Sequence, residues 1–389
     1  MMNTEARANS ALQQANQEFS NALRRNSDLL RHPPTITVYE KKFVITFIII
    51  PFAIAGALIR VALQRLETFP GAPVFSLVYA QWIGCFIMGI VTLHKNNIFF
   101  LYHPLQVALS TGLCGSITTF SSWQLGIFDE FANINAADHT RGKNVLAALS
   151  QLVVTLAMSF SGYHCGHHVG RWLDHMGLFH PVLRRLVGGQ TSNNGDDKNS
   201  GGSNNGIGEI NGNIIEQSPP VPQLWHCGFS ISCMSWVDRI IVVFGILSWI
   251  GVIIAAVLAP ADQRELALTC VFAPVGALLR WYLSFFNGIR SDIFVGTFAA
   301  NMLGTLVLAV ISLLRSGVTM SSVSCSVLGA LADGFCGCLT TISTFVVELS
   351  VLPLRQSYIY ALTSVVLGQC FMFIIVGPFI WTRGFNGTC

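Results

Sequence analysis

Two apolar stretches of the sequence share the spacing Gly-x-x-Gly-x-x-Thr-Thr, at residues 112–119 and 334–341. Glycine weakens a helix and threonine adds a hydroxyl group, so we expect the helix in each stretch to break at membrane depth. A broken helix frees backbone carbonyls, which protein, water or an ion must then satisfy. Four of these carbonyls could share a cation between the two stretches, those of Gly115, Thr118, Gly337 and Thr340. The same spacing is also typical of glycines at a tight crossing of two helices, and spacing alone favours neither interpretation.

Pairs of large side chains follow each predicted break. Phe120 and Trp123 lie three residues apart, as do Ile342 and Phe345, so each pair shares a helix face, and packing is the ordinary role of such a face. Neutral polar groups in the apolar segments shift the balance away from packing alone: Asn301, Thr305, Tyr360, Ser364, Gln81, Gln151 and Thr155. The tyrosine and the serine of this set are four residues apart and align as donors on one helix face. Donors without a fixed positive charge suit an anion that must leave as readily as it enters.

The sequence contains an internal repeat. Gly56–Arg60 (GALIR) recurs 220 positions later as Gly276–Arg280 (GALLR), and residues 112–123 recur 222 positions later as residues 334–345. Two matches in the same order exclude chance similarity between apolar helices. The chain therefore consists of two halves that share one fold.

Composition places most of the chain in a membrane. Hydrophobic residues make up 52% of the 389 residues and charged residues 11%, about half the charged fraction of an ordinary soluble domain. The net charge of +3 is scattered, with no run of Lys and Arg interleaved with aromatics, so nucleic-acid binding has no support. We expect an all-α polytopic protein with nine crossings, near residues 43–64, 74–94, 104–131, 145–168, 240–259, 266–286, 293–314, 323–350 and 357–381.

The crossings define an order of segments along the chain. We expect a polar cytoplasmic tail, a first four-helix repeat, a flexible linker rich in Asn, Gly and Ser, a linking transmembrane helix and a second four-helix repeat, at residues 1–40, 41–185, 186–238, 239–260 and 261–389. The linking helix has no repeat partner, and one extra crossing inverts the second half relative to the first. Lysine and arginine gather in loops on the side of the amino terminus, which we therefore place in the cytoplasm, with Cys389 outside. A glycosylation sequon at Asn386 agrees with this orientation.

These features together resemble the Fluc (CrcB) fluoride channels, and the fused duplicate with an added helix resembles their eukaryotic two-domain form, the fluoride export (FEX) proteins. The resemblance is carried by Gly-x-x-x-Arg, by a second-helix Asn before Gly, and by Gly-x-x-Gly-x-x-Thr-Thr-Phe-Ser-x-Phe, which cover both halves but neither the tail nor the linker. It implies a plasma-membrane channel that lets fluoride leave passively, with the single fused chain in the lipid bilayer as the functional unit. It also implies a central structural sodium ion (Na+), no organic cofactor and no enzymatic reaction, the sodium being held by backbone carbonyls of Gly115, Thr118, Gly337 and Thr340.

The resemblance further implies pores lined by an asparagine, by phenylalanine edges and by hydroxyl groups. One set of residues fits this pattern and predicts a fluoride pore: Asn301, Phe120, Phe345, Tyr360, Ser364, Thr119, Ser121, Thr341 and Ser343. The other set departs from the pattern and predicts a vestigial pore: Gln81, Trp123, Ile342 and Gln151, with Ala147 aligned to the tyrosine. We therefore expect one working pore and one that no longer conducts.

A coupled secondary transporter of a small anion is the alternative, because inverted repeats and broken helices also build such carriers. A carrier usually places an ionisable relay inside the membrane. The carboxylates of the predicted crossings lie near probable helix ends: Asp129, Glu130, Asp333 and Glu348. An enzyme has less support, because no Ser/His/Asp set, metal box or nucleotide loop stands on a shared element.

Two further groups of polar residues have structural interpretations. We expect Arg60 and Arg280, near helix ends, to snorkel towards the membrane surface or to bind loop carbonyls. A cluster on one helix could suggest a metal site: His164, Cys165, His167 and His168. We interpret this cluster as the polar end of a helix at the membrane surface, because no second pair of ligands is visible.

Overall fold

The computed structural model describes residues 38–66, 68–69, 74–134, 141–176, 224–226, 235–288 and 293–384. The predicted tail before residue 38, most of the predicted linker at 186–238 and the sequon at Asn386 lie outside these residues. The chain divides into two compact units, residues 1–42 with 194–230 and residues 43–193 with 231–389. In the described part of the first unit, β1 (Val38–Glu40) pairs in parallel with β2 (Leu224–His226).

Every regular element among the described residues of the second unit is a helix. Its first half consists of α2 (Lys42–Leu66), α3 (Val78–Leu93), α4 (Lys95–Val107), the π-helix η1 (Ala108–Cys114), α5 (Gly115–Ile117), α6 (Phe120–Ala132) and α7 (Arg141–His175). The long apolar run of α2 suits a membrane crossing. Helix α6 ends where Asn133 takes the left-handed conformation, at φ 52°, which cannot continue a right-handed helix.

The second half repeats this order after an additional helix. It consists of α9 (Trp236–Leu258), α10 (Arg264–Ser284), the 3-10 turn η3 (Phe285–Gly288), α11 (Val295–Gly317), α12 (Ser322–Ala330), the π-helix η4 (Leu331–Cys336), α13 (Gly337–Leu339), α14 (Ser343–Val351), α15 (Leu354–Ile375) and α16 (Gly377–Arg383). A capping box starts α9, because the Ser235 side chain accepts from the Asp238 backbone N–H and the Asp238 side chain accepts from that of Ser235.

Both predicted helix breaks are confirmed. A π-helix and a three-residue helix precede each break, and the backbone then becomes extended at Thr118 (ψ 149°) and Thr340 (ψ 155°). The alternative interpretation of the glycines also holds. A Cβ atom on Gly112 would lie 2.8 Å from Cβ of Phe52 in α2, and one on Gly334 would lie 2.6 Å from the Thr269 carbonyl of α10. The glycines therefore allow close helix contacts beside each break.

Seven described segments are long and apolar enough to cross a membrane: Lys42–Leu66, Gly142–His175, Trp236–Leu258, Arg264–Gly288, Val295–Gly317, Ser322–Val351 and Leu354–Arg383. Helix α3, where the sequence predicts a crossing, is shorter at 16 residues. The predicted crossing at 104–131 is divided among α4, η1, α5 and α6. A chain with this many apolar helices is a multi-pass membrane protein.

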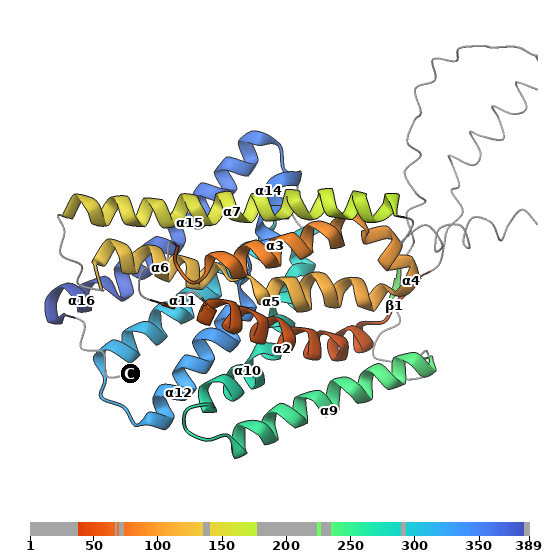
Figure 1. The fold of residues 1–389 in the computed structure, drawn as a ribbon, viewed down its shortest axis with the longest axis horizontal. Coiled ribbons are helices and arrows are strands. Elements are labelled where there is room, and N and C mark those ends of the chain that lie inside the picture. Colours follow the sequence, from red (N-terminus) through yellow and green to blue (C-terminus); the bar gives the residue numbers. More distant parts are fainter. Residues whose placement is uncertain are drawn as a thin grey trace, which may run out of the picture. The chain divides into compact units, whose positions relative to one another are not determined.

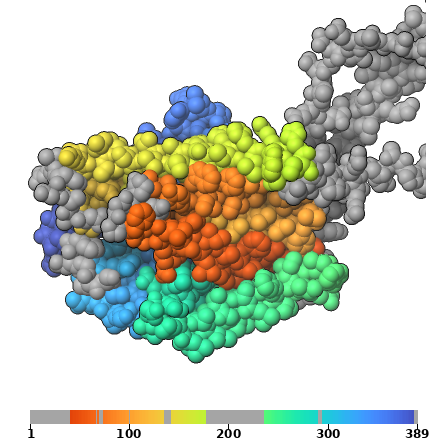
Figure 2. All heavy atoms as spheres, viewed as in Figure 1, coloured from red at the N-terminus to blue at the C-terminus, as the bar shows by residue number. Residues whose placement is uncertain are grey.

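Helix α9 lies on the outside of the helical unit. It runs along one edge of the ribbon in Figure 1, and its atoms form the lower border of the unit in Figure 2. Gly245 lies against the backbone of Phe47 in α2, so this side of α9 packs closely. The opposite side carries exposed apolar side chains such as Phe244 and Val257, at 60% and 78% exposure. An uncovered apolar face of this kind suits contact with lipid.

Candidate ion pathway

The two broken helices cap each other. The hydroxyl oxygen of Thr340 accepts from the backbone N–H groups of Phe120 and Ser121, both at 3.1 Å, at the start of α6. The hydroxyl oxygen of Thr118 accepts from the backbone N–H of Ser343 at 3.0 Å, at the start of α14. The first N–H groups of a helix have no partner within it, and a side-chain oxygen satisfies them. Each half therefore completes the helix that follows the break in the other half.

Four of the six predicted pore hydroxyls, those of Thr119, Ser121, Thr341 and Ser343, lie at this junction and are fully buried. The hydroxyl of Thr118 is 3.1 Å from that of Thr341 and donates to that of Ser343 at 3.0 Å. The hydroxyls of Thr119 and Ser121 are each 3.0 Å from that of Thr340. The structure thus gathers the hydroxyls that the sequence assigns to the breaks into two networks, Thr118 with Thr341 and Ser343, and Thr340 with Thr119 and Ser121, and each network joins the two halves.

Gln81 and Asn301 perform the same task in the two halves. The amide of Gln81 donates to the carbonyl of Thr119 at 2.7 Å and accepts from its N–H at 3.2 Å. The amide of Asn301 donates to the carbonyl of Thr341 at 3.3 Å and accepts from its N–H at 2.9 Å. Each amide holds the extended residue after the break by both backbone groups. The difference between Gln and Asn is one of length, and neither half lacks this clamp.

The repeated arginines turn inward rather than towards the membrane surface. Arg60 and Arg280 are 1% and 4% exposed. Arg60 donates to the carbonyls of Ser116, at 2.7 Å, and of Asp333 in the other half. Arg280 makes the reciprocal contact and donates to the carbonyl of Thr111 at 2.5 Å. The carbonyls that the two arginines bind belong to the broken helices rather than to loops, and snorkelling is not observed, so the structural role of the arginines stays a prediction.

Backbone carbonyls from both halves accept hydrogen bonds from a single nitrogen of Arg280. Its Nη1 donates to Gly115 at 2.6 Å and to Thr340 at 3.2 Å. These are two of the four carbonyls that the sequence assigns to a cation. A Cβ atom on Gly115 would collide with this guanidinium group, and one on Gly337 would collide with that of Arg60. Both glycines therefore leave room for a positive group beside the freed carbonyls.

Four aromatic rings form a buried row across the two halves. The rings of Phe120 and Phe345, the predicted intact pair, meet edge to face with centroids 5.6 Å apart. Trp123 continues the row on one side, 5.4 Å from Phe120, and Tyr360 continues it on the other, 5.2 Å from Phe345. Ile342 belongs to the same buried cluster. Edge-to-face contacts leave positive ring edges in the core, where an anion can meet them.

Glu348 is a buried carboxyl that the sequence interpretation missed. It lies near the end of α14, as expected, but it is only 4% exposed. Thr297 and Tyr360 donate to its two oxygens, at 2.5 Å and 2.9 Å. Its position three residues after Phe345 was the available signal, since residues three apart share a helix face. A predicted pore tyrosine is therefore bonded to a carboxyl group.

The side of the aromatic row that ends at Trp123 has no carboxyl group at the position that corresponds to Glu348. The residue 222 positions before Glu348 is Gly126, and the amide of Gln151 lies against it. The indole N–H of Trp123 donates to the carbonyl of Gln151 at 3.4 Å. On the opposite side, Ser364 donates to the carbonyl of Tyr360 at 2.8 Å, so both predicted donors of α15 point into the core. The two sides of the aromatic row thus carry different polar groups.

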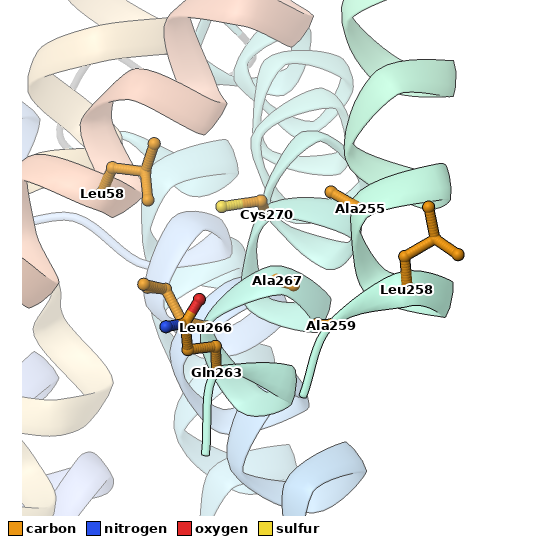
Figure 3. Close-up of a pocket in the computed structure, with 8 residues that line it drawn as sticks. All are labelled: Leu58, Ala255, Leu258, Ala259, Gln263, Leu266, Ala267 and Cys270. Carbon is orange, nitrogen blue, oxygen red and sulfur yellow. The ribbon is translucent and has the colours of Figure 1, made fainter. Parts of the chain in front are cut away.

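Two pockets differ in their position relative to the aromatic row. A pocket of about 220 Å³ lies beside the Tyr360 ring and is lined by Ile293, Val295, Phe298, Tyr360 and Thr363. A pocket of about 310 Å³ lies between α2, α9 and α10, as Figure 3 shows, and is lined by Leu58, Ala255, Leu258, Ala259, Gln263, Leu266, Ala267 and Cys270. The second pocket is almost wholly apolar and contains none of the predicted site residues. Only the first adjoins the aromatic row.

The histidine cluster of α7 does not form a metal site with other side chains in the described part of the chain. His167 is 3.2 Å from the hydroxyl of Thr92 in α3. Within the described ranges, no three His, Cys, Asp or Glu side chains come close enough to hold a metal ion.

Comparison with known proteins places these features in a family. A family model described as "CrcB-like protein, Camphor Resistance (CrcB)" matches residues 47–163 and 267–377. Fluoride export protein 1 of Neurospora crassa is 27% identical over 88% of this chain and 68% of its own length. Fluoride export protein 1 of Schizosaccharomyces pombe is 29% identical over 85% of this chain and 94% of its own. The Fluoride-specific ion channel FluC of Desulfovibrio desulfuricans is 36% identical over 32% of this chain and 97% of its own. No solved structure matches.

Replacement of Thr340 by valine tests the reciprocal caps. Thr340→Val keeps the shape of the side chain but leaves two backbone N–H groups of α6 without their acceptor, so we expect the free energy of unfolding to fall by about 2 kcal/mol. Thr382→Val, which removes an exposed hydroxyl bonded within its own helix, is the matched control and should have little effect. Thermal unfolding in detergent measures both variants, and equal stability of the two would contradict the capping role.

Proposed function

This chain belongs to the CrcB-like family, and on that premise we propose that it is a channel through which fluoride leaves the cell passively. The names of its relatives, fluoride export proteins and a fluoride-specific ion channel, support the choice of ion. The observation that carries the proposal is the Phe120–Phe345 pair, because it brings one ring from each half into edge-to-face contact beside the buried hydroxyl groups of α15. The single fused chain in its lipid bilayer is the functional unit of this proposal.

The proposed pore passes along the Phe120–Phe345 pair and the neighbouring neutral donors. Tyr360 and Ser364 stand one helical turn apart on α15, and both are 1% exposed. The two hydroxyls donate to Glu348 and to the Tyr360 carbonyl, so each would exchange that bond for one to the passing anion. Ring edges and exchangeable donors of this kind bind an anion weakly at several successive points, which lets the ion enter without being trapped. Asn301 contributes by holding the extended backbone of Thr341 in place. The gradient of fluoride and the membrane potential then set the direction of flow.

We propose that the second pore is vestigial. Its predicted residues are Gln81, Trp123, Ile342 and Gln151. Trp123 stands in the first half where the second half has Phe345, so a larger indole replaces a phenyl ring. The indole N–H is also bonded to a backbone carbonyl. Ile342 offers no positive ring edge where the other half has Phe120.

The membrane arrangement belongs to the same proposal. We place two four-helix repeats in inverted topology, with nine crossings and α9 as the inverting helix. Thr118 and Thr340 make equivalent contacts with the opposite half, and so do Arg60 and Arg280. These matched contacts support a two-fold relation between the halves. The distribution of Lys and Arg supports an amino terminus in the cytoplasm and a carboxyl terminus outside. We place the protein in the plasma membrane because fluoride must cross that membrane to leave the cell.

We propose a structural sodium ion at the junction of the breaks. Carbonyl oxygens are the hard ligands that such a cation prefers, and those of Gly115 and Thr340 already converge on one positively charged donor, Nη1 of Arg280. Gly115, Thr118, Gly337 and Thr340 would hold the ion through their carbonyls. Bound there, sodium would supply positive charge that fixes the freed carbonyls of both halves in one arrangement.

Fluoride efflux from proteoliposomes tests the assignment of the working pore. We expect Asn301→Asp and Phe120→Ile to lower flux at least tenfold, because the first adds a negative charge beside the path and the second removes a ring edge. Gln81→Asn, which keeps an amide to clamp Thr119, and Trp123→Ala should retain most of the flux. Loss of flux in the second pair with retention in the first would reverse the assignment, and thermal unfolding of each variant separates loss of function from loss of fold.

Replacement of sodium by N-methyl-D-glucamine tests the proposed cation. Because sodium would bind the folded protein and not the unfolded chain, we expect its removal to lower the unfolding temperature, with recovery on adding sodium back. Gly337→Ala should weaken this response, since a Cβ atom there would collide with the guanidinium group of Arg60. An unfolding temperature independent of sodium in the unaltered protein would contradict the site.

The alternative function is a proton-coupled transporter of a small anion, and Glu348 gives it a specific basis. A carboxyl buried between Thr297 and Tyr360 could carry a proton beside the proposed path. We favour the channel because Glu348 is the one carboxyl among the described residues that bonds to a predicted pore side chain, whereas a relay needs successive carriers.

A proton gradient distinguishes the two mechanisms. With equal fluoride on both sides of a voltage-clamped liposome, a pH difference of two should drive no fluoride through a channel, whereas a coupled carrier would accumulate it. Glu348→Gln keeps both hydroxyl partners and should leave flux voltage-driven. Fluoride accumulation that disappears in Glu348→Gln would establish the transporter.

A further inference from the structure

Gln124 is a buried amide placed directly along the proposed path. It lies one helical turn after Phe120 on the same face of α6, and it is 0% exposed. The backbone of α15 approaches it closely, since a Cβ atom on Gly368 would lie 3.0–3.1 Å from the Gln124 amide group. The absence of a side chain at Gly368 therefore gives this amide its place between α6 and α15.

The orientation of the Gln124 amide follows from its neighbour. The side-chain nitrogen of Gln369 is 2.8 Å from the backbone carbonyl of Gln124 and 2.8 Å from one atom of the Gln124 side-chain amide. A backbone carbonyl only accepts, so the Gln369 atom is the donating nitrogen, and the Gln124 atom that faces it must be the oxygen. The Nε2 group of Gln124 therefore points elsewhere.

This Nε2 group is a donor without an acceptor. It is fully buried, and no atom of the described residues forms a hydrogen bond with it. Buried polar groups are nearly always paired, and each exception calls for a function or an unseen partner. A neutral N–H group that faces an apolar environment is a suitable donor for a small anion.

The location of Gln124 places the donor after the aromatic pair. Tyr360, Ser364 and Gly368 follow one another at four-residue steps along α15, and Gln124 lies against the last of them. Glu348 is bonded to Tyr360, at the other end of this series. The residue that corresponds to Gln124 in the second half, 222 positions later, is the apolar Val346. Only one of the two proposed pores therefore has this donor.

We propose that Nε2 of Gln124 donates to fluoride at a second binding position, beyond the Phe120–Phe345 rings as seen from Glu348. Gln369 is a positioning residue that holds the Gln124 oxygen and so directs Nε2 towards the ion. A donor on each side of the rings lets the anion exchange one weak contact for the next, as rapid conduction requires. This inference rests on the proposed fluoride function and adds a residue to that pore.

Fluoride efflux from proteoliposomes containing Gln124→Met tests the inference. Methionine keeps the length of the side chain but has no donor, so we expect at least a tenfold loss of flux and a higher half-saturating fluoride concentration. Gln106→Met, at a half-buried glutamine of α4 bonded to the Ser110 hydroxyl at the start of η1, is the matched control and should stay within twofold of the unaltered protein. Flux and half-saturation equal to those of the control would overturn the inference.

Gly368→Ala probes the same amide from the other helix. Alanine favours a helix over glycine, and its methyl group would push the Gln124 amide from its position. We expect flux to fall at least fivefold at an unchanged unfolding temperature, and unchanged flux would overturn the inference even if Gln124→Met failed to fold. Gln369→Met should raise the half-saturating concentration without changing the unfolding temperature, and the absence of that rise would exclude the positioning role. Absence of fluoride flux in the unaltered protein would instead contradict the proposed function itself.

Discussion

Thr118 and Thr340 each cap the helix that follows the break in the other half. In a membrane the broken ends of these helices have no water to bond with, so neither half can keep its break without the other. The arginines add a second exchange, since each donates to a carbonyl in the π-helix of the opposite half. Two helices broken at membrane depth are therefore stable only as a pair, and every side chain of the proposed pore is positioned by that pair.

The two arginines that donate to the opposite half also place positive charge in the core. Arg60 and Arg280 are buried, and their contacts described above are with carbonyl oxygens. Carbonyl dipoles compensate part of the cost of removing a guanidinium group from water, which is large when no polar partner is present. A core of this kind is favourable for an anion that passes nearby, while the proposed donors Tyr360, Ser364 and Gln124 carry no fixed positive charge. The anion is thus attracted by the surroundings without being held by a fixed opposite charge.

The two sides of the aromatic row share a backbone and differ in chemistry. Gln81 and Asn301 clamp the two breaks in the same way, so duplication has preserved the frame. One side carries Glu348, Tyr360 and Gln124, whereas the corresponding positions on the other are Gly126, Ala147 and Val346. Residues that hold the breaks are therefore equivalent in the two halves, and residues that would meet an ion are not. This division agrees with one frame that supports a single specialised path.

The sequence by itself determined the membrane class, the duplication, the two helix breaks and the residue types around them. These features depend on local composition and on spacing along one helix, such as Gly-x-x-Gly-x-x-Thr-Thr at both breaks. Only the tertiary structure decided that Thr340 caps α6, that Arg280 reaches Gly115, that Glu348 is bonded to Tyr360, and that Gln124 keeps a free donor. Most of these contacts join segments far apart in the chain, or depend on how neighbouring helices exclude other partners. Spacing specifies which side chains share a helix face, but the packing of the two halves decides which side chains meet across it.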